Sequence, residues 1–505
     1  MSAKRSTAES YHELTNYTHE TLRRVSAPDP GQQPAPFKEV VSSQRVPLRA
    51  YLPFGKDPFT GERLDPAPPS DEGDLGLAVL SRLLFHTYGI TGVVQFEGGG
   101  GHMLRAAPSA GALYPSELYL VAPPLPELEA GIYHYQVAQH ELVRLWEGDH
   151  TDAVQRALGG QAFPDTRAFL LLSGVFWRSA WRYGERGYRR VLLDAGHVLG
   201  NLAAYAPAEG WTAVPAAGFN DAALNGLLFL DDAQEAVLLC MPILREESVP
   251  RPSRLLRSSV TLGKADGSPN VSGPEALAAS ATVALHRASC CEADAALVEA
   301  GVGAAPSDGA LPLTPPTRRP PVHAGRAILR RRSARSYSGE AIGLQPLALC
   351  LDSTFCRSAP DAAECWFPVR RSGLLDSKLV ALRVEGLAPG IYGIEGAGEA
   401  LLPLSLGDFG ERFFEATLAQ EIARDCAAAV AFTAPLHAAV ERWGERAYRY
   451  LHLEAGHLGE RLQIAATSAR LSCCGIAGFL DEEAASLLAL EPDEITLYFV
   501  TLGKE

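Results

Sequence analysis

Arg182-Tyr-Gly-Glu-Arg-Gly-Tyr-Arg189 recurs in the second half of the chain as Arg442-Trp-Gly-Glu-Arg-Ala-Tyr-Arg449. At the same offset, Asp194-Ala-Gly-His197 falls on Glu454-Ala-Gly-His457 without a gap. Chance similarity does not hold its register over so long a stretch. The repeat therefore predicts that the chain contains two copies of one domain.

The similarity extends to both sides of this stretch. Downstream, Ala217-Gly-Phe-Asn-Asp221 matches Ala477-Gly-Phe-Leu-Asp481, and upstream Gly131-Ile-Tyr133 matches Gly390-Ile-Tyr392 after a shift of one residue. A copy of about 180 residues is far longer than a solenoid repeat. Two equal copies resemble a homodimer whose subunits were joined, with a pseudo-two-fold interface that can hold a ligand.

Hydrophobic periodicity gives the fold class of each copy. Apolar residues recur at helical spacing near Leu75–Leu84 and over residues 185–205, whereas residues 117–124, 168–175 and 237–243 are typical of strands. We predict an α+β fold in each copy, a central antiparallel-type sheet flanked by helices. The predicted segments are a polar arm with one short helix (1–74), the first domain (75–245), a linker with one helix at Pro274–His286 (246–325) and the second domain (326–505).

Composition excludes several classes of protein. With 505 residues, 47% of them hydrophobic, the chain is globular, and its net charge of -14 makes general nucleic-acid binding unfavourable. Nine cysteines without CxxC spacing predict neither a disulfide scaffold nor a metal site. The N-terminus has no apolar core of a signal peptide, and no apolar run is long enough for a membrane helix, so we expect a cytoplasmic protein.

Two segments invite a chemical interpretation. Arg105-Ala-Ala-Pro-Ser-Ala-Gly-Ala-Leu-Tyr-Pro115 is a loop that would expose backbone N–H groups and a hydroxyl, although it could also be a simple turn before a strand. Arg330-Arg-Arg-Ser-Ala-Arg-Ser-Tyr337 carries four arginines, whose planar forks match phosphate geometry. The alternative for this segment is a solvated basic end of the linker. His197 and His457 are interpreted as packed interface residues.

Taken together, these segments resemble the nitroreductase superfamily, and in particular its SagB-type branch of FMN-dependent azoline dehydrogenases from peptide natural-product pathways. The resemblance rests on the following segments: Tyr11–Thr15, Leu80–Leu84, Tyr88–Thr91, Pro108–Pro115, Gly131–Tyr135, Tyr188-Arg189, Asp194–His197 with Asn201, and Arg331–Arg335. It covers nearly the whole chain outside the linker, and it implies a tandem duplication.

The resemblance also implies where FMN would bind, between the two copies. The second copy would supply Arg331, Arg332, Ser333, Arg335, Gly478 and Lys504, and the first would supply Pro108, Ser109, Ala110 and Gly111. The reciprocal site lacks both motifs: an acidic stretch, LDPAPPSDEGDLG, replaces the arginines, and Arg370–Ser377 replaces the Pro-Ser loop. We therefore expect one FMN for each chain.

The implied activity is oxidation of peptide thiazolines or oxazolines to azoles. Azoline oxidases of this branch carry a Lys-Tyr pair, which here is Arg182-Tyr183. Because arginine stays protonated, it cannot replace lysine as a general base. Tyr183 and Arg182 are the catalytic candidates. Two alternatives stay open: an NAD(P)H-dependent reductase of small quinone, nitro or enone substrates, and a degenerate scaffold that binds a peptide or a partner enzyme such as a cyclodehydratase.

Overall fold

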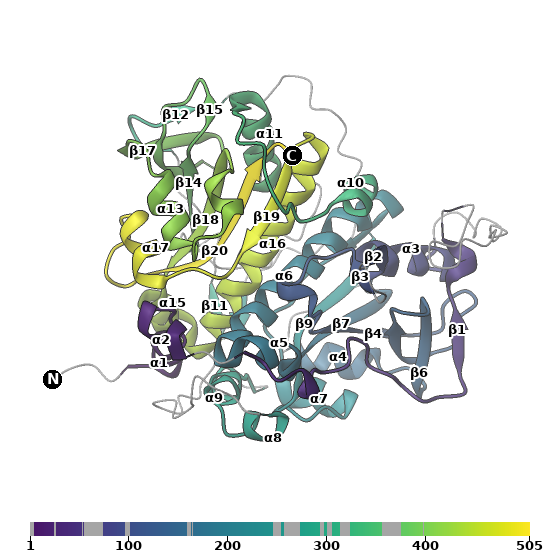
Figure 1. Cartoon of the computed structure of the whole chain (residues 1–505). Coiled ribbons are helices and arrows are strands. Elements are labelled where there is room, and N and C mark those ends of the chain that lie inside the picture. The colour runs from purple at the N-terminus through teal and green to yellow at the C-terminus, as the bar shows by residue number, and fades with distance from the viewer. Residues whose placement is uncertain are drawn as a thin grey trace.

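Two seven-stranded sheets with helices on their faces form the body of the protein in the computed structural model (Figure 1). The structure describes residues 5–24, 27–52, 54, 74–95, 101–158, 163, 165–245, 254–256, 273–292, 297–299, 306–313, 324–355, 375–396 and 398–505. The two sheets confirm the predicted α+β class and its duplication.

The first sheet has the strand order β1-β6-β5-β4-β7-β9-β8, and every neighbouring pair is antiparallel. Its strands are β1 (Arg45–Pro47), β4 (Ser116–Ala122), β5 (Gly131–Gln136), β6 (Glu141–Glu147), β7 (Ala168–Val175), β8 (Trp211–Ala213) and β9 (Glu235–Arg245). The helices of this half are α1 (Thr7–Leu14), α2 (His19–Arg24), α3 (Leu77–Tyr88), α4 (Thr151–Ala157), α5 (Phe176–Tyr183), α6 (Gly187–Tyr205) and α7 (Asp221–Leu228). A hairpin, β2 (Ile90–Gln95) with β3 (Gly101–Arg105), stands apart from the sheet.

The second sheet repeats this order as β12-β17-β16-β14-β18-β20-β19. Its strands are β12 (Leu311–Pro312), β14 (Asp376–Ala381), β16 (Gly390–Glu395), β17 (Ala400–Leu406), β18 (Ala428–Pro435), β19 (Ser472–Ile476) and β20 (Glu494–Gly503). The helices are α10 (Ala324–Arg330), α11 (Leu344–Phe355), α13 (Gly410–Ala416), α14 (Glu421–Arg424), α15 (Leu436–Trp443), α16 (Ala447–Ser468) and α17 (Asp481–Leu487). Two short pairs complete the strands: β13 (Ile342–Gly343) with β15 (Val384–Glu385), and β10 (Arg254–Leu256) with β11 (Leu297–Glu299).

Helices α6 and α16 pack against each other in the centre of the molecule, between the two sheets (Figure 1). The glycines of the two Ala-Gly-His segments explain this close approach. A Cβ atom on Gly196 would lie 2.3 Å from the carbonyl oxygen of Leu453, and one on Gly456 would lie 2.2 Å from that of Leu193. Any side chain at either position would separate the halves, so the repeated glycines fix the interface between the two copies.

Helix α1 of the N-terminal segment lies against the second copy. The backbone N–H groups of Thr7 and Ala8 donate to the Glu445 carboxylate, with N–O distances of 3.0 and 2.7 Å. At the pseudo-equivalent place, helix α9 (Ala281–Ala288) donates from Ala281 and Thr282 to Glu185, at 2.9 and 2.8 Å. A carboxylate at a helix N-terminus is stabilised by the free N–H groups and the helix dipole. Glu445 of the second copy thus binds the helix that precedes the first copy, and Glu185 of the first copy binds the helix that precedes the second.

The segment 246–325 therefore contains more than a connector where it is described. The single helix expected at Pro274–His286 is divided into α8 (Pro274–Leu277) and α9, and Ser280 begins α9 by accepting from the Val283 N–H. Similarly, the arm contains two helices, α1 and α2, where the sequence predicts one. The Gly98–Gly101 loop lies outside the described residues except for Gly101, and Arg370–Ser377 lies outside them as far as residue 374.

The arm continues along the first copy after α2. Three side chains of that copy bind its carbonyl oxygens: Trp181 binds Asp29 at 2.8 Å, Arg178 binds Ala35 at 3.2 Å and Arg105 binds Pro36 at 2.7 Å. Lys38 then pairs with Glu235 at 2.6 Å. The arm is packed on its own chain over this length. Across the described segments, none of the helices combines the length and the apolar character that a bilayer crossing requires.

Candidate functional site

The Pro-Ser loop of the first copy is held by the central helix α6. The Ser109 hydroxyl donates to the Asp194 carboxylate at 2.5 Å, and it accepts from the Tyr114 N–H at 2.8 Å. The Ala110 N–H also points to Asp194, at 3.3 Å. Burial raises the pKa of the Asp194 carboxyl to about 6, although the Ser109 hydrogen bond opposes this shift. Pro108, Ser109 and Ala110 are half-buried, so the loop reaches the surface of the site.

Gly111 brings this loop onto the two predicted catalytic residues. Its φ of +65° lies in the left-handed region, which favours glycine. A Cβ atom there would lie 2.7 Å from the Tyr183 hydroxyl and 3.4 Å from Cδ of Arg182. Arg182 is exposed and Tyr183 is half-buried. The structure therefore brings Gly111, Arg182 and Tyr183 together. Burial raises the pKa of the Tyr183 phenol despite the nearby charges of Arg190 and Arg182.

Arg190 joins this cluster to the glycine turn of the second copy. Its guanidinium carbon lies 3.8 Å from the centre of the Tyr183 ring, and its Nη2 lies 3.5 Å from the Ala477 carbonyl oxygen. The nearest atoms to a Cβ on Gly478 would be 3.5 Å or more away. The turn is half-buried, and Gln420 donates to the Gly478 carbonyl at 3.0 Å. A Cβ on Gly478 would thus be in ordinary contact with its neighbours, Arg190 among them.

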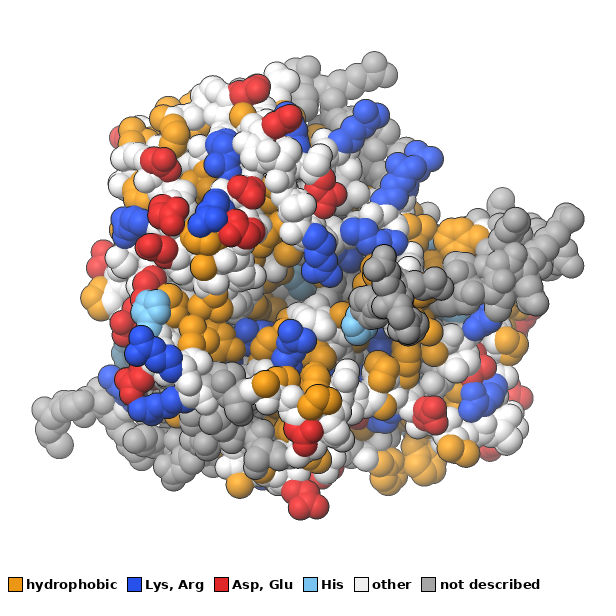
Figure 2. Space-filling view, in the orientation of Figure 1, with side chains coloured by type: hydrophobic (Ala, Val, Ile, Leu, Met, Phe, Trp, Pro, Cys, Tyr) orange, Lys and Arg blue, Asp and Glu red, His pale blue; other side chains and the backbone are white. Residues whose placement is uncertain are grey.

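The arginine segment meets the first copy beside the same loop. Arg331 is buried, and its Nε donates to the Ala106 carbonyl at 3.2 Å, two residues before Pro108. Arg332 is exposed, and its Nη2 donates to the Thr91 carbonyl at 2.7 Å. Burial and the charge of Arg331 lower the pKa of the Arg332 guanidinium. Figure 2 shows Lys and Arg side chains gathered beside α10, on the face where the halves meet.

Three other predicted residues, Ser333, Arg335 and Lys504, lie beside strands β19 and β20 of the second sheet. Ser333 forms a parallel bridge with Cys473 of β19, and Arg335 is exposed near Cys474. Lys504 pairs with Glu340 at 3.5 Å. Among the described residues, the contacts of Lys504 do not reach the Pro-Ser loop. We call the assembly of residues 108–111, Tyr183, Arg190, Ala477-Gly478 and Arg331–Arg335 the composite site.

A buried network connects the arginine segment with the interface helices. Arg331 Nε lies 3.6 Å from the Glu460 carboxylate, and the other oxygen of Glu460 lies 2.8 Å from His197 Nδ1. His197 Nε2 is 3.0 Å from the Tyr498 hydroxyl. The repeated Ala-Gly-His motif thus supplies a packed interface histidine. Glu460 could not be found from the repeat, because a glycine, Gly200, stands at the corresponding position of the first copy.

The described residues of the reciprocal site, Gly218, Trp443, Tyr450 and Cys291, are all buried. Trp443 and Tyr450 replace Tyr183 and Arg190 at the repeat offset, and both are fully buried. Gly218, the counterpart of the half-buried Gly478, is buried too. The two copies have therefore diverged at this place: polar, partly exposed side chains line one site, whereas large buried rings fill the other.

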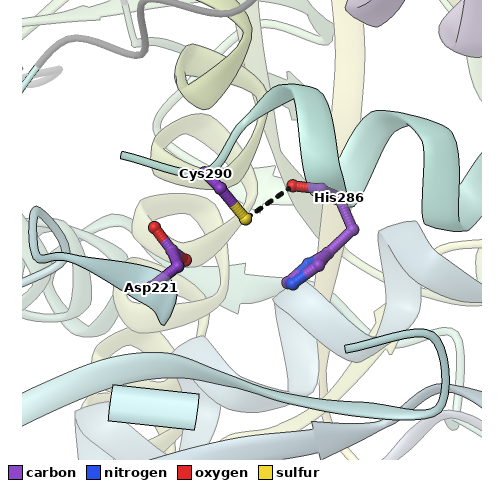
Figure 3. Close-up of side chains that lie close together, drawn as sticks. All are labelled: Asp221, His286 and Cys290. Carbon is purple, nitrogen blue, oxygen red and sulfur yellow. Dashed lines mark hydrogen bonds between the residues drawn. The ribbon is translucent and has the colours of Figure 1, made fainter. Parts of the chain in front are cut away.

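A cluster of potential metal ligands lies outside the composite site (Figure 3). Asp221, His286 and Cys290 bring their ligand atoms within 4.8 Å of one another. However, Arg446 and Arg449 bind the two oxygens of Asp221, at 2.5 and 2.6 Å. Burial raises the pKa of the Cys290 thiol to about 11, and it lowers that of His286 well below its usual value. Two guanidinium groups and a protonated thiol disfavour a cation here.

The pseudo-equivalent cluster supports a structural role. Asp481 is bound there by Arg186 and Arg189, at 2.6 and 3.0 Å. The Arg189 guanidinium also binds the Thr15 hydroxyl and the Asn16 side chain at the end of α1, at 2.6 and 2.9 Å. Arginine and aspartate thus clamp the preceding helix in both copies. Asp221 and Asp481 are the first residues of α7 and α17.

The sequence of each copy matches the model of the nitroreductase family, over residues 77–243 and 328–504. The chain belongs to the nitroreductase family. Members of this family typically use flavin cofactors. The composite site contains residues from both nitroreductase-family copies of this chain.

Known proteins similar to this nitroreductase-family chain include the following three. A nitroreductase structure from Anabaena variabilis has a TM-score of 0.84 and 31% identity, and the match covers 99% of each chain. A protein of Methanocaldococcus jannaschii named as a nitroreductase is 31% identical over 173 residues, 34% of this chain and 82% of the relative. The trifolitoxin-processing protein TfxB of Rhizobium leguminosarum bv. trifolii is 29% identical over 211 residues, 40% of this chain and 55% of its own length.

Proposed function

We propose that this chain is an FMN-dependent oxidoreductase that binds one flavin in the composite site. The observation that carries the proposal is the divergence of the two pseudo-equivalent places. The open one combines a half-buried loop at Ser109 with a half-buried turn at Gly478, whereas Gly218 and Trp443 are buried in the other. In the part of the chain that the structure describes, the arginine segment lies beside the Pro-Ser loop of the open place, where Arg331 donates to the Ala106 carbonyl.

The donor set of the composite site fits an FMN. Arg332 and Arg335 are exposed and, within the described residues, form no ion pair with a carboxylate, so their positive charges are not neutralised. The Arg332 guanidinium also donates to the carbonyl oxygens of Leu329, Arg331 and Thr91. The half-buried turn at Gly478 carries no side chain that would cover the flat face of a ring, and Arg190 lies beside it. The Ser109 hydroxyl already donates to Asp194, so it can only accept from a ligand. When bound, the flavin would supply the redox chemistry, and the protein would bind and orient the reactants.

The substrate we propose is a peptide that carries a thiazoline or oxazoline, which the enzyme oxidises to the azole. The similarity to a protein named for trifolitoxin processing supports a modified peptide as the substrate class. A partner enzyme such as a cyclodehydratase fits the same proposal. Its docking surface would differ from the arm, because Trp181, Arg178 and Arg105 hold the arm on this chain.

The visible absorption spectrum of the purified chain, with the released flavin counted, tests the cofactor. We expect about one FMN for each chain. Two would show that the reciprocal site is also open, and none after adding FMN would favour a scaffold.

Turnover then tests the substrate. We expect the loaded enzyme to oxidise azoline peptides with consumption of oxygen. NAD(P)H consumption with a quinone or nitro compound, without activity on the peptide, would instead identify a small-molecule reductase.

A further inference from the structure

Tyr17 of the N-terminal arm lies against the composite site. Its backbone is fixed on α17: the Tyr17 N–H donates to the Asp481 carboxylate at 2.7 Å, and the Asp481 N–H donates to the Tyr17 carbonyl at 3.1 Å. Its ring lies below two guanidinium groups, since the Cζ atoms of Arg186 and Arg190 are 4.3 and 5.7 Å from the ring centre. Arg190 is the same side chain that covers Tyr183 and reaches Ala477.

The reciprocal site provides an internal comparison. Cys291 occupies the position of Tyr17, because its N–H donates to Asp221 at 2.8 Å and the Asp221 N–H donates to its carbonyl at 3.2 Å. Cys291 is 1% exposed, whereas Tyr17 is half-buried. The same backbone arrangement therefore presents a phenol to the open site and a small buried thiol to the closed one. Backbone anchoring alone does not require a tyrosine.

We infer that Tyr17 is a catalytic acid–base residue of the composite site, held there by Arg190. The inference rests on the proposed function. In the proposed oxidation the substrate loses a proton and a hydride. The Tyr17 phenolate oxygen would accept the proton, and a flavin held in the composite site would supply the two-electron acceptor for the hydride.

The surrounding charges favour the phenolate of Tyr17. Burial raises the pKa of the Tyr17 phenol. The positive charges of Arg190, Arg186 and Arg189, together with a hydrogen bond from Arg190, lower this pKa by more than burial raises it. The net pKa lies below the usual value of tyrosine.

Two other groups face Tyr17, and neither changes this assignment. The Asp481 carboxylate accepts the Tyr17 N–H and is itself paired with Arg186 and Arg189. The Tyr183 phenol, by contrast, has a raised pKa and stays protonated. Of the two tyrosines at the site, Tyr17 is the better proton acceptor and Tyr183 the better hydrogen-bond donor.

The first test uses the full chain labelled with ¹³C-tyrosine and titrated by NMR without substrate. We expect a tyrosine resonance that titrates below pH ~10, the ordinary tyrosine pKa. It should disappear in Tyr17→Phe, remain in Tyr183→Phe and titrate at higher pH in Arg190→Met. A Tyr17 resonance that titrates at or above the ordinary pKa would overturn the inference.

The second test uses the flavin-loaded enzyme. Tyr17→Phe keeps the ring and both backbone hydrogen bonds, so we expect it to keep its flavin and its KM and to lose about 100-fold or more in kcat. The control Cys291→Ala should leave kcat unchanged. Full activity of Tyr17→Phe would refute the catalytic role while leaving the flavin site intact. A chain that binds no flavin would fail the proposed function itself, and with it the role of Tyr17 in the reaction.

Discussion

Ser109 and Asp194 are joined by a hydrogen bond of 2.5 Å that ties the Pro-Ser loop to the interface helix α6. The position of the Pro-Ser loop therefore depends on a buried carboxyl group. Asp194 comes from the Asp-Ala-Gly-His motif, whose glycine fixes the contact between the copies. The position of the loop is therefore coupled to the packing of α6 on α16.

Asp194 should make the stability of the protein fall as the pH rises. Its pKa is raised to about 6 in the folded state, above the value of about 3.9 for an unperturbed aspartate. The folded state then binds more protons between these values, so the free energy of unfolding decreases from about pH 4 to pH 6. Asp194→Asn keeps an acceptor for Ser109 and should stabilise the flavin-free chain above pH ~6 by on the order of 3 kcal/mol.

Urea unfolding at a series of pH values measures this difference. Asp232→Asn is the control: its ion pair with Arg287 is exposed, so the variant should change the free energy of unfolding by about 1 kcal/mol or less. A gain in Asp194→Asn that does not depend on pH would contradict the prediction.

Gly111→Ala should destabilise the chain through Tyr183. The left-handed φ costs an alanine about 1 kcal/mol, and its Cβ would lie 2.7 Å from the Tyr183 hydroxyl. Because Arg190 covers the Tyr183 ring, that side chain cannot move away freely. In a Tyr183→Phe background the clash is absent, so Gly111→Ala should cost roughly 1 kcal/mol less than in the wild type. A double-mutant cycle measured by denaturant unfolding gives this coupling, and a coupling of zero would mean that the two residues are not in contact.

Arg449 should contribute strongly to stability because it clamps α9. Its guanidinium binds the Asp221 carboxylate at 2.6 Å and the Ser289 hydroxyl at 2.5 Å, and all three residues are buried. Arg449→Met would leave the Asp221 charge only partly compensated, and we expect a loss of about 3–5 kcal/mol in the free energy of unfolding. Arg287→Met is the control, since its pair with Asp232 is exposed and should cost about 1 kcal/mol or less. Equal losses would show that the clamp is not important.

Metal chelation should leave the protein unchanged. Asp221 is already neutralised by Arg446 and Arg449, so the cluster with His286 and Cys290 has no need of a cation. Dialysis against a chelator, followed by thermal unfolding, should give the same Tm before and after treatment. A lower Tm after chelation, restored by one equivalent of zinc, would show that the arginines make way for a metal.

The repeat made the duplication and the main elements predictable from sequence. The strand expected at residues 168–175 is β7 with the same bounds, and the helix expected at 185–205 is α6, beginning at Gly187. The contact of α9 with Glu185 could not be predicted from the repeat, because the sequences of α1 and α9 share little beyond a serine and a histidine. Their roles lie in backbone N–H groups, which any sequence provides.

The site was predictable only in part for a similar reason. Ser109 and Gly111 contact residues of the first copy, whereas Arg331 of the second copy reaches the Ala106 carbonyl of the first. Arg190 and Tyr17 were missed, although the break in the repeat at Arg190, where the second copy has Tyr450, was a signal that could have been used. Tyr17 is placed by main-chain bonds to Asp481, 464 residues away in sequence, which no local pattern records.

A substitution in either half of the composite site should weaken the binding of FMN. Arg332→Ala removes an exposed cation of the second copy, and Ser109→Ala releases the loop of the first copy from Asp194. Charge-assisted hydrogen bonds of about 1.5–3 kcal/mol correspond to an increase of about 10- to 100-fold in the Kd for FMN. Fluorescence quenching of added FMN measures this constant. Arg424→Ala, which removes an exposed cation paired with Glu421 in the same half, is the control and should bind FMN normally. If Ser109→Ala binds FMN normally while Arg332→Ala does not, then the flavin is held by the second copy alone, and a site shared between the halves is excluded.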